Sequence, residues 1–222
     1  MKLTAIIVAA GNSRRMGFDK LLAPLAGKPV LQRSIESFIQ CDTVNDIILV
    51  CPKERFKQLN LKPSQKHVQI VEGGADRHDS VAAGLSVIAQ NADEKHYIAV
   101  HDGARPLITP NQITRVYEHA LQHHCAACAT PISDTIKRVN DLGIVQESVS
   151  RDNLWAMQTP QIFRVDLLQQ AYQEVLAKGK RVTDEVSALQ LIGYPTHLID
   201  NPDPNPKITY PQDISQAEHL LS

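Results

Sequence analysis

The sequence predicts an α/β fold, with a doubly wound, mostly parallel sheet that carries helices on both faces. Apolar runs of strand length alternate with segments of helical period, which is the pattern of a parallel sheet covered on both sides. One stretch, residues 132–152, breaks this alternation and predicts a protruding β-hairpin arm. The chain has 222 residues and is 43% hydrophobic, enough for one principal core. We therefore expect residues 1–222 to form a single domain.

The predicted strands are apolar nearly throughout, as buried parallel strands are. They span residues 3–10, 46–52, 67–73, 96–102 and 125–131. The segments between them carry apolar residues at helical spacing. The helices expected from this spacing lie at residues 29–41, 54–59, 79–91 and 111–124.

The arm is predicted where the rhythm changes after Pro131. Polar and apolar residues alternate there on either side of a turn at residues 140–143, which is typical of an exposed hairpin. A two-stranded sheet is marginal alone in water. We therefore expect the arm to pack against something, and a second copy of the chain, giving a homodimer, is the simplest candidate.

Helical spacing returns in the last third of the chain. Thr183 is the expected N-cap of a short helix, and Gly193 is expected to end it. Four prolines between residues 200 and 213 exclude a helix there and stiffen the approach to Lys207. The helices expected in this region lie at residues 165–179, at residues 184–193 and from about residue 212 onward.

Composition excludes several classes of partner. The chain has 23 Lys plus Arg against 24 Asp plus Glu, with a pI near 6.7. Such a balance gives no overall field that attracts nucleic acid or an anionic membrane. No apolar run is long enough to span a bilayer, and the N-terminus does not have the pattern of a signal or transit segment. We expect a soluble cytoplasmic protein without nucleic-acid or membrane partners.

The cysteines predict reduced thiols, because their spacing does not suggest a disulfide framework. They are Cys41, Cys51, Cys125 and Cys128. The C-x-x-C pair beside His123 and His124 allows a zinc or redox site. A closed zinc site usually draws its ligands from two loops, whereas one run would supply all of them here. We interpret this run as small residues of a buried strand.

The loop after the first strand is the first place to search for chemistry, since ligands of open parallel sheets bind beyond the carboxyl ends of the strands. It lacks both the G-x-G-x-x-G spacing and the Gly-Lys-Ser/Thr step of the familiar phosphate loops. It instead has a small-residue turn followed by cations, which suits a triphosphate. A solvated basic loop is the alternative. The residues concerned are Ala9, Ala10, Gly11, Arg14, Arg15 and Lys20.

Two other strand ends carry residues of the same kind. Gly73 and Gly74 offer a close-approach turn, and Arg77 and Ser80 follow at the opening of a helix. The alternative is a simple turn. Asp102 emerges from a hydrophobic strand, where a carboxylate is a natural ligand for Mg²⁺. Capping of a turn is the structural alternative for this side chain.

Several motifs together identify a family. With A-A-G-x-x-x-R-M-G, G-G-x-x-R-x-x-S-V and H-D-G-A-R-P in this order, the chain resembles the 2-C-methyl-D-erythritol 4-phosphate cytidylyltransferases, members of the nucleotidyltransferase superfamily. The match continues through "SDTIKRV", "SRDNLWAMQTPQIF", "VTDEVSALQLIG" and "PKITYPQD", and so spans nearly the whole chain.

The resemblance implies a Rossmann-like nucleotidyltransferase domain over residues 1–222, with residues 132–152 as a dimerisation arm. It implies transfer of CMP from CTP to methylerythritol phosphate, with Mg²⁺ as cofactor, in non-mevalonate isoprenoid biosynthesis. Pyrophosphate leaves, and no covalent enzyme intermediate is expected. Because the substrate phosphate is itself the nucleophile, catalysis should consist mainly of positioning and charge neutralisation.

The resemblance also assigns roles to residues. The catalytic cations are Arg15, Lys20 and Lys207, and Asp102 holds the metal. The nucleotide is bound by Ala9, Ala10, Gly11, Gly74 and Ser80. The acceptor is bound by Asp102, Arg105, Thr135, Arg151, Thr159 and Thr183, with Thr135 and Arg151 supplied by the arm of a second copy.

The sequence departs from the family in two places and leaves two rival functions open. It has Asp19 before Lys20 where many members have proline, and Ala75 where some have a carboxylate. A cytidylyltransferase for another polyol phosphate, such as ribitol 5-phosphate, would keep nearly every loop. A non-catalytic nucleotide-binding module is the other rival. Retention of the catalytic cations together with Asp102 favours an enzyme.

Overall fold

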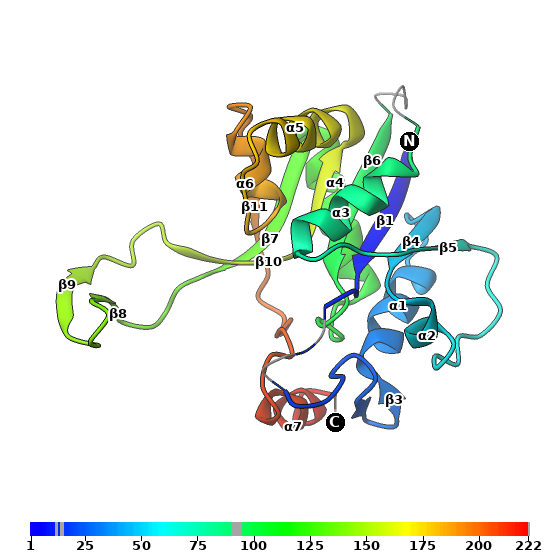
Figure 1. Ribbon diagram of the computed structural model, residues 1–222, viewed down its shortest axis with the longest axis horizontal. Helices are drawn as coiled ribbons and strands as arrows, with labels where there is room; N and C mark the ends of the chain where they lie inside the picture. The colour runs from blue at the N-terminus through cyan, green and yellow to red at the C-terminus, as the bar shows by residue number, and fades with distance from the viewer. Residues whose placement is uncertain (12, 14–15, 90–94, 222) are drawn as a thin grey trace.

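The computed structural model, which describes residues 1–11, 13, 16–89 and 95–221, has a central sheet between two layers of helices (Figure 1). Within these residues the sheet has seven strands in the order β11-β7-β10-β6-β1-β4-β5. Their bounds are β1 Lys2–Val8, β4 Asp46–Val50, β5 His67–Val71, β6 His96–Asp102, β7 Cys125–Pro131, β10 Trp155–Arg164 and β11 His197–Asp200. The expected α/β class with a mostly parallel sheet is confirmed.

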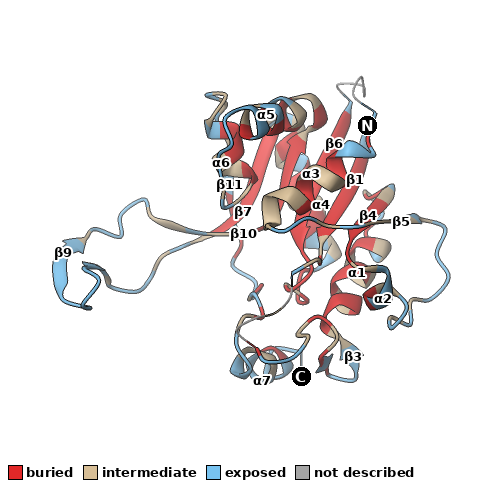
Figure 2. Ribbon diagram, in the orientation of Figure 1, coloured by how far each residue is buried: buried red, intermediate tan, exposed pale blue. Residues whose placement is uncertain are grey.

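The helices divide between the two faces of the sheet. One core contains side chains of α1 and α4, and the other contains side chains of α3, α5 and α6. The helices are α1 Val30–Gln40, α2 Lys53–Phe56, α3 Arg77–Ser86, α4 Pro110–His123, α5 Val165–Ala177, α6 Glu185–Gln190 and α7 Gln212–His219. Figure 2 shows the buried residues concentrated in the sheet and on the helix faces that cover it.

Strand β1 shows why apolar runs without alternation produce this architecture. Leu3, Ala5 and Ile7 face the core beneath α1 and α4, whereas Ile6 faces the core beneath α3 and α5. Because successive side chains of a strand point to opposite faces, a strand with two covered faces is apolar at nearly every position.

The register of the strands brings their carboxyl ends level. Val8 of β1 lies opposite Val50 of β4 and also opposite Asp102 of β6, and Val50 lies opposite Val71 of β5. The segments that follow these strands therefore leave the sheet along one edge. They include the small-residue turn after Val8 and the glycine pair after β5, so this edge is where the site must form.

Two strands of the central sheet were not predicted from periodicity. β10 runs antiparallel to both β6 and β7, and β11 pairs parallel with β7 at the edge. The polar Gln-Thr-Pro-Gln step inside β10 hides it from a pattern search. A two-residue pair, β2 Pro24–Leu25 with β3 Lys28–Pro29, is too short for any periodic signal.

The predicted cap of α6 is wrong by one residue. Asp184 is the N-cap, and its carboxylate accepts a hydrogen bond from the backbone N–H of Ser187. The hydroxyl of Thr183 contacts the hydroxyl of Ser187 instead, at 3.2 Å. Asp and Thr are both good cap residues, so sequence alone does not decide between adjacent ones. Gly193 has a φ of 69° and lies in the turn beyond the helix.

The arm is an antiparallel hairpin of β8 Ile136–Val139 and β9 Val145–Val149, with Gly143 at a φ of 75° in its turn. Figure 1 shows it extending away from the body of the molecule. Four of its apolar side chains are exposed, namely Val139, Leu142, Ile144 and Val145. The hairpin is as expected, whereas its role in dimerisation stays a prediction.

The cysteines lie as their spacing predicts. All four cysteines are free and buried, and Cys125 and Cys128 lie in β7 as the strand interpretation requires. Burial raises the pKa of both of these thiols to about 12.

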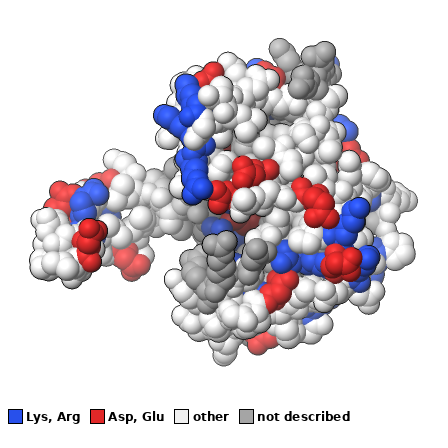
Figure 3. Space-filling model, viewed as in Figure 1, with Lys and Arg blue, Asp and Glu red and all other residues white. Residues whose placement is uncertain are grey.

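Basic and acidic groups are interspersed over the face shown in Figure 3, including the arm. No helix in the described part of the chain is long and apolar enough to cross a membrane.

His101 predicts a pH dependence of stability. Burial lowers its pKa from 6.5 to about 3, and Thr159 and the carbonyl of Arg105 contact its two ring nitrogens. At a pH between these two pKa values, the unfolded chain carries a proton on His101 that the folded chain does not. The free energy of unfolding should therefore fall with decreasing pH, with a contribution from this residue of about 1.4 kcal/mol per pH unit.

Urea unfolding at several pH values between 6.5 and 4 measures this slope. His101→Gln should flatten it, and His67→Gln, at an exposed position on β5, is the matched control. An unchanged slope in His101→Gln would contradict the assignment.

Candidate active site

A cavity of about 750 Å³ opens at the carboxyl ends of β1, β4, β5 and β6. It brings together segments that are far apart in the sequence: the loop after β1, the turn between β5 and α3, the end of β6 and the C-terminal segment before α7. Ten of the sequence-predicted site residues border it, namely Ala9, Ala10, Gly11, Lys20, Gly73, Gly74, Arg77, Ser80, Asp102 and Lys207. Arg14 and Arg15 lie outside the described residues.

The glycine pair is required by close packing. A Cβ atom on Gly73 would lie 2.3 Å from the Cβ of Ala10 and 2.9 Å from the hydroxyl oxygen of Ser80. A Cβ on Gly74 would lie 2.3 Å from the Cβ of Asp79. Such distances are far below van der Waals contact, so only glycine fits at either position. The close approach holds the small-residue turn after β1 against the opening of α3.

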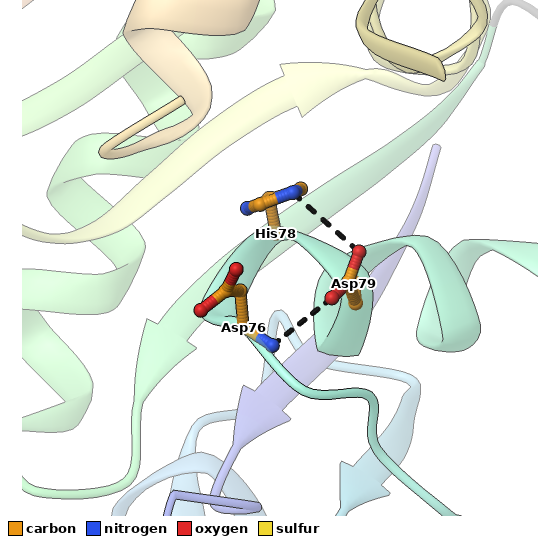
Figure 4. Close-up of side chains that lie close together, drawn as sticks. All are labelled: Asp76, His78 and Asp79. Carbon is orange, nitrogen blue, oxygen red and sulfur yellow. Dashed lines mark hydrogen bonds and ion pairs between the residues drawn. The ribbon is translucent and has the colours of Figure 1, made fainter. Parts of the chain in front are cut away.

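The N-terminus of α3 faces the same cavity. Asp76 is its N-cap and forms a capping box with Asp79, whose carboxylate accepts from the Asp76 N–H at 3.0 Å. Figure 4 shows His78 and Asp79 as neighbours, with 3.5 Å between His78 Nε2 and Asp79 Oδ1. These three side chains are close enough to hold a cation. Because the carboxylates already cap the helix, we interpret the group as structural.

The carboxylate of Asp102 is held between two cations. Its Oδ1 accepts from Arg77 Nε at 2.8 Å, and its Oδ2 accepts from Lys207 Nζ at 2.7 Å. Burial alone would raise the pKa of Asp102, but the charges of Arg77 and Lys207 outweigh it and hold that pKa well below its usual range. Asp102 is therefore ionised at neutral pH, as a metal ligand must be.

A second buried carboxylate continues this chain of charges. Arg77 donates from both terminal nitrogens to Glu185, at 2.7 and 2.9 Å, and the Tyr172 hydroxyl donates to the same carboxylate at 3.0 Å. Glu185 is fully buried at the start of α6. Burial would lower the pKa of Arg77, but Glu185 and Asp102 raise it above its usual value. We name Lys207, Asp102, Arg77 and Glu185 the charge chain.

Backbone contacts hold in place the two segments whose lysines border the cavity. Lys20 Nζ donates to the carbonyl of Ile208 at 2.7 Å, and the N–H of Ile208 donates to the carbonyl of Ala104 at 2.8 Å. The C-terminal segment that carries Lys207 is thus fastened to the loop after β1 and to the turn after β6. Lys20, Lys207 and Asp102 consequently border one cavity, together with Arg77, Glu72 and Asp76. Such a mixture of ammonium and carboxylate groups suits a polyphosphate with a divalent cation.

The family model for 2-C-methyl-D-erythritol 4-phosphate cytidylyltransferase (IspD) matches residues 3–222. The chain belongs to this family. The enzyme of that name from Dehalococcoides mccartyi (strain CBDB1) is 40% identical, over 99% of this chain and 96% of the relative. The enzyme of that name from Symbiobacterium thermophilum is 38% identical, over 99% of this chain and 92% of the relative.

Solved structures agree in fold. The crystal structure of the Francisella tularensis 2-C-methyl-D-erythritol 4-phosphate cytidylyltransferase superposes with a TM-score of 0.86 at 28% identity, over 99% of this chain and 100% of that one. The corresponding Thermus thermophilus structure gives a TM-score of 0.80 at 28% identity, over 99% and 98% of the two chains. The cytidylyltransferase fold therefore extends over essentially the whole chain.

Five residues that the family resemblance assigns to the acceptor are absent from the cavity wall of this single chain: Arg105, Thr135, Arg151, Thr159 and Thr183. Arg105 donates to the carbonyls of Asn205 and Met157. Thr159 is buried, and its hydroxyl accepts from the backbone N–H of Asp102 at 3.1 Å. Thr135 and Arg151 belong to the arm, and Thr183 is exposed before α6.

Sequence reasoning missed Glu185 and the pairing of Arg77 with Asp102. A glutamate in the first turn of a helix is ordinarily an exposed residue that complements the helix dipole. The burial of Glu185 is visible only in the tertiary contacts. Its backbone N–H donates to Gln161 of β10, and its carboxylate accepts from Tyr172 of α5 and from Arg77. The sequence offers no signal that separates the two cases.

Glu185 should be essential to stability. Glu185→Ala leaves Arg77 largely buried with only Asp102 as a counter-charge, and removal of one partner of a buried ion pair costs about 3 kcal/mol or more. Tyr172→Phe removes one hydrogen bond to the same carboxylate and should cost about 1 kcal/mol. Urea unfolding of both variants beside the wild type measures these costs. Equal stability of Glu185→Ala and wild type would contradict the buried charge chain.

Proposed function

We propose that the chain transfers CMP from CTP to the phosphate of 2-C-methyl-D-erythritol 4-phosphate, forming 4-diphosphocytidyl-2-C-methyl-D-erythritol and pyrophosphate. The observation that supports it most directly is that Lys20, Asp102 and Lys207, from three remote segments, border one cavity with the predicted nucleotide-binding residues. Relatives that match over the whole chain bear the name of this activity.

The reaction is a single in-line displacement. An oxygen of the acceptor phosphate attacks the α-phosphorus of CTP, and the bond from that phosphorus to the bridging oxygen of the β-phosphate breaks. Pyrophosphate leaves with the bonding electrons. Two polyanions must approach each other, so cations on both sides of the α-phosphorus lower the barrier. Lys20 and Lys207 supply this charge, together with Arg15 as a prediction from the sequence.

The base and ribose are received by the small-residue turn and the glycine pair. Ala9, Ala10, Gly11 and Gly74 allow close approach of the ligand to the backbone, and Ser80 contributes a hydroxyl at the start of α3. The helix N-terminus adds a positive partial charge on the same side of the cavity. These groups bind and orient CTP rather than react with it.

Asp102 fits a magnesium ion, because it is an ionised oxygen ligand at the border of the cavity. The ion, when bound, neutralises phosphate oxygens of the nucleotide. Arg77 and Lys207 each donate to one oxygen of this carboxylate, so a bound ion would share Asp102 with both side chains. The Thr159 hydroxyl, which accepts from the Asp102 N–H, keeps the end of β6 in place.

The arm is proposed to complete the acceptor site of a second copy in a homodimer. Thr135 and Arg151 are exposed on this arm and do not border the cavity of their own chain. Val139, Leu142, Ile144 and Val145 are 51%, 82%, 58% and 56% exposed, a high apolar exposure for a hairpin that is marginal alone. A second copy would bury this apolar surface.

Lysine variants test the reaction. Lys20→Ala and Lys207→Ala should each lower turnover by about 10²–10³ while the fold is retained, because each removes charge from the transition state. Lys178→Ala, at the exposed C-cap of α5, is the matched control. Pyrophosphate release is measured with methylerythritol phosphate and ribitol 5-phosphate, with all four ribonucleoside triphosphates, and with and without Mg²⁺.

Each part of this assay has an outcome that would contradict the proposal. Pyrophosphate release at the wild-type rate in either lysine variant would contradict the proposed mechanism. Faster turnover of ribitol 5-phosphate would replace the acceptor, and full activity without a divalent cation would remove the proposed role of Asp102 as a metal ligand.

Complementation tests the arm. Lys20→Ala has a defective cavity and an intact arm, whereas Arg151→Ala has the reverse. In a mixed dimer one of the two sites receives both intact parts, so re-association of equal amounts should restore about a quarter of wild-type activity. Each variant alone should be nearly inactive. Absence of any restoration in verified mixed dimers would show that the arm serves its own chain.

A further inference from the structure

Arg55, a residue outside the cavity wall, holds the start and the end of the loop that carries Lys20. It lies on α2, which follows β4, and only 8% of it is exposed. Its terminal nitrogens donate to the carbonyl oxygens of Ala9 and, at 3.2 Å, of Gly11, where the loop begins. Its Nε donates to Asp19 Oδ2 at 2.8 Å, where the loop ends.

The second point is the charge of Asp19. This carboxylate immediately precedes Lys20, which borders the cavity, and its side chain is 32% exposed. A negative charge beside a lysine that binds phosphate would repel a triphosphate. Asp19 is nevertheless useful locally, because its Oδ1 accepts from the N–H of Leu21 at 3.1 Å. The guanidinium of Arg55 neutralises the carboxylate from the side away from solvent.

The third point is geometric. Ala9 and Gly11 border the cavity, and their carbonyl oxygens are the acceptors that Arg55 takes. A planar guanidinium donates in fixed directions, so its three contacts set the spacing between the two ends of the loop. A lysine could replace the charge of Arg55 but could not make the same three contacts.

We propose that Arg55 is a positioning residue for the nucleoside triphosphate: it aligns the cavity-facing turn of residues 9–11 with Lys20 and cancels the charge of Asp19. The inference rests on the proposed function, in that CTP is taken as the ligand of the cavity. Arg55 acts through the loop and does not itself touch the nucleotide.

The test is a double-mutant cycle on the full-length protein, read by calorimetric titration of CTP and by KM and kcat in the pyrophosphate assay. Arg55→Met should weaken CTP binding about tenfold, because it uncovers Asp19 and releases the loop. Asp19→Asn should bind CTP about threefold more tightly, since the charge of Arg55 is then uncompensated. The double variant should recover to within about threefold of wild type.

Further measurements separate positioning from simple support of the fold. Added salt should shrink the effect of Arg55→Met, because exposed charges are screened. Arg55→Lys should fall between wild type and Arg55→Met, and it also serves if Arg55→Met does not fold. Arg33→Met is the matched control, since Arg33 likewise donates to two backbone carbonyls, those of Leu25 and Ala26, away from the cavity. It should bind CTP like wild type.

The possible results divide cleanly. CTP affinity in Arg55→Met and Arg55→Lys equal to that of wild type overturns the inference, and so does a double variant as weak as Arg55→Met. Failure of the wild type itself to bind CTP overturns the proposed function instead. If the wild type binds CTP but transfers no CMP, the proposed transfer to the acceptor is contradicted. The role of Arg55 is then still tested by CTP binding.

Discussion

The site depends on a carboxylate that is kept charged inside the protein. Asp102 stands at the end of a strand buried on both faces, where an isolated charge would be prohibitively costly. Arg77 and Lys207 make it tolerable, and Glu185 in turn balances Arg77. The four residues come from β6, α3, α6 and the C-terminal segment. The charge chain therefore links the C-terminal segment to three elements that also share one hydrophobic core. The ion pairs that stabilise the charge of Asp102 are therefore also contacts that hold the border of the cavity together.

Close packing supplies the second constraint. The turn after β1 and the start of α3 lie so close together that Ala10 and Ser80 leave no room for a side chain on Gly73. On this side of the cavity, a ligand therefore meets backbone groups rather than bulky side chains. The register of β1, β4 and β6 places these segments along one edge. The cavity is therefore bordered both by small residues, such as Ala9 and Gly74, and by charged ones, such as Lys20 and Asp102.

The sequence predicted most of this arrangement, and the misses have physical reasons. The buried strands and the glycine turn follow from local pattern, and Lys20, Asp102 and Lys207 follow from motifs of the family. Glu185 and Arg55 were not found, because charged residues on short helices are usually solvated and their burial arises from tertiary contacts. Asp184 and Thr183 are equivalent as caps on sequence grounds. β10 was missed as a strand because polar residues and a proline interrupt its apolar pattern.

The way in which the arm is rooted has a mechanical consequence. It leaves β7 and returns into β10, and these strands pair from Trp155 opposite Pro131 onward. β10 also pairs with β6, and its Thr159 is hydrogen-bonded to the amide of Asp102. A displacement of the hairpin at its root would therefore act on Thr159 and, through its hydrogen bond, on the backbone of Asp102 at the border of the cavity.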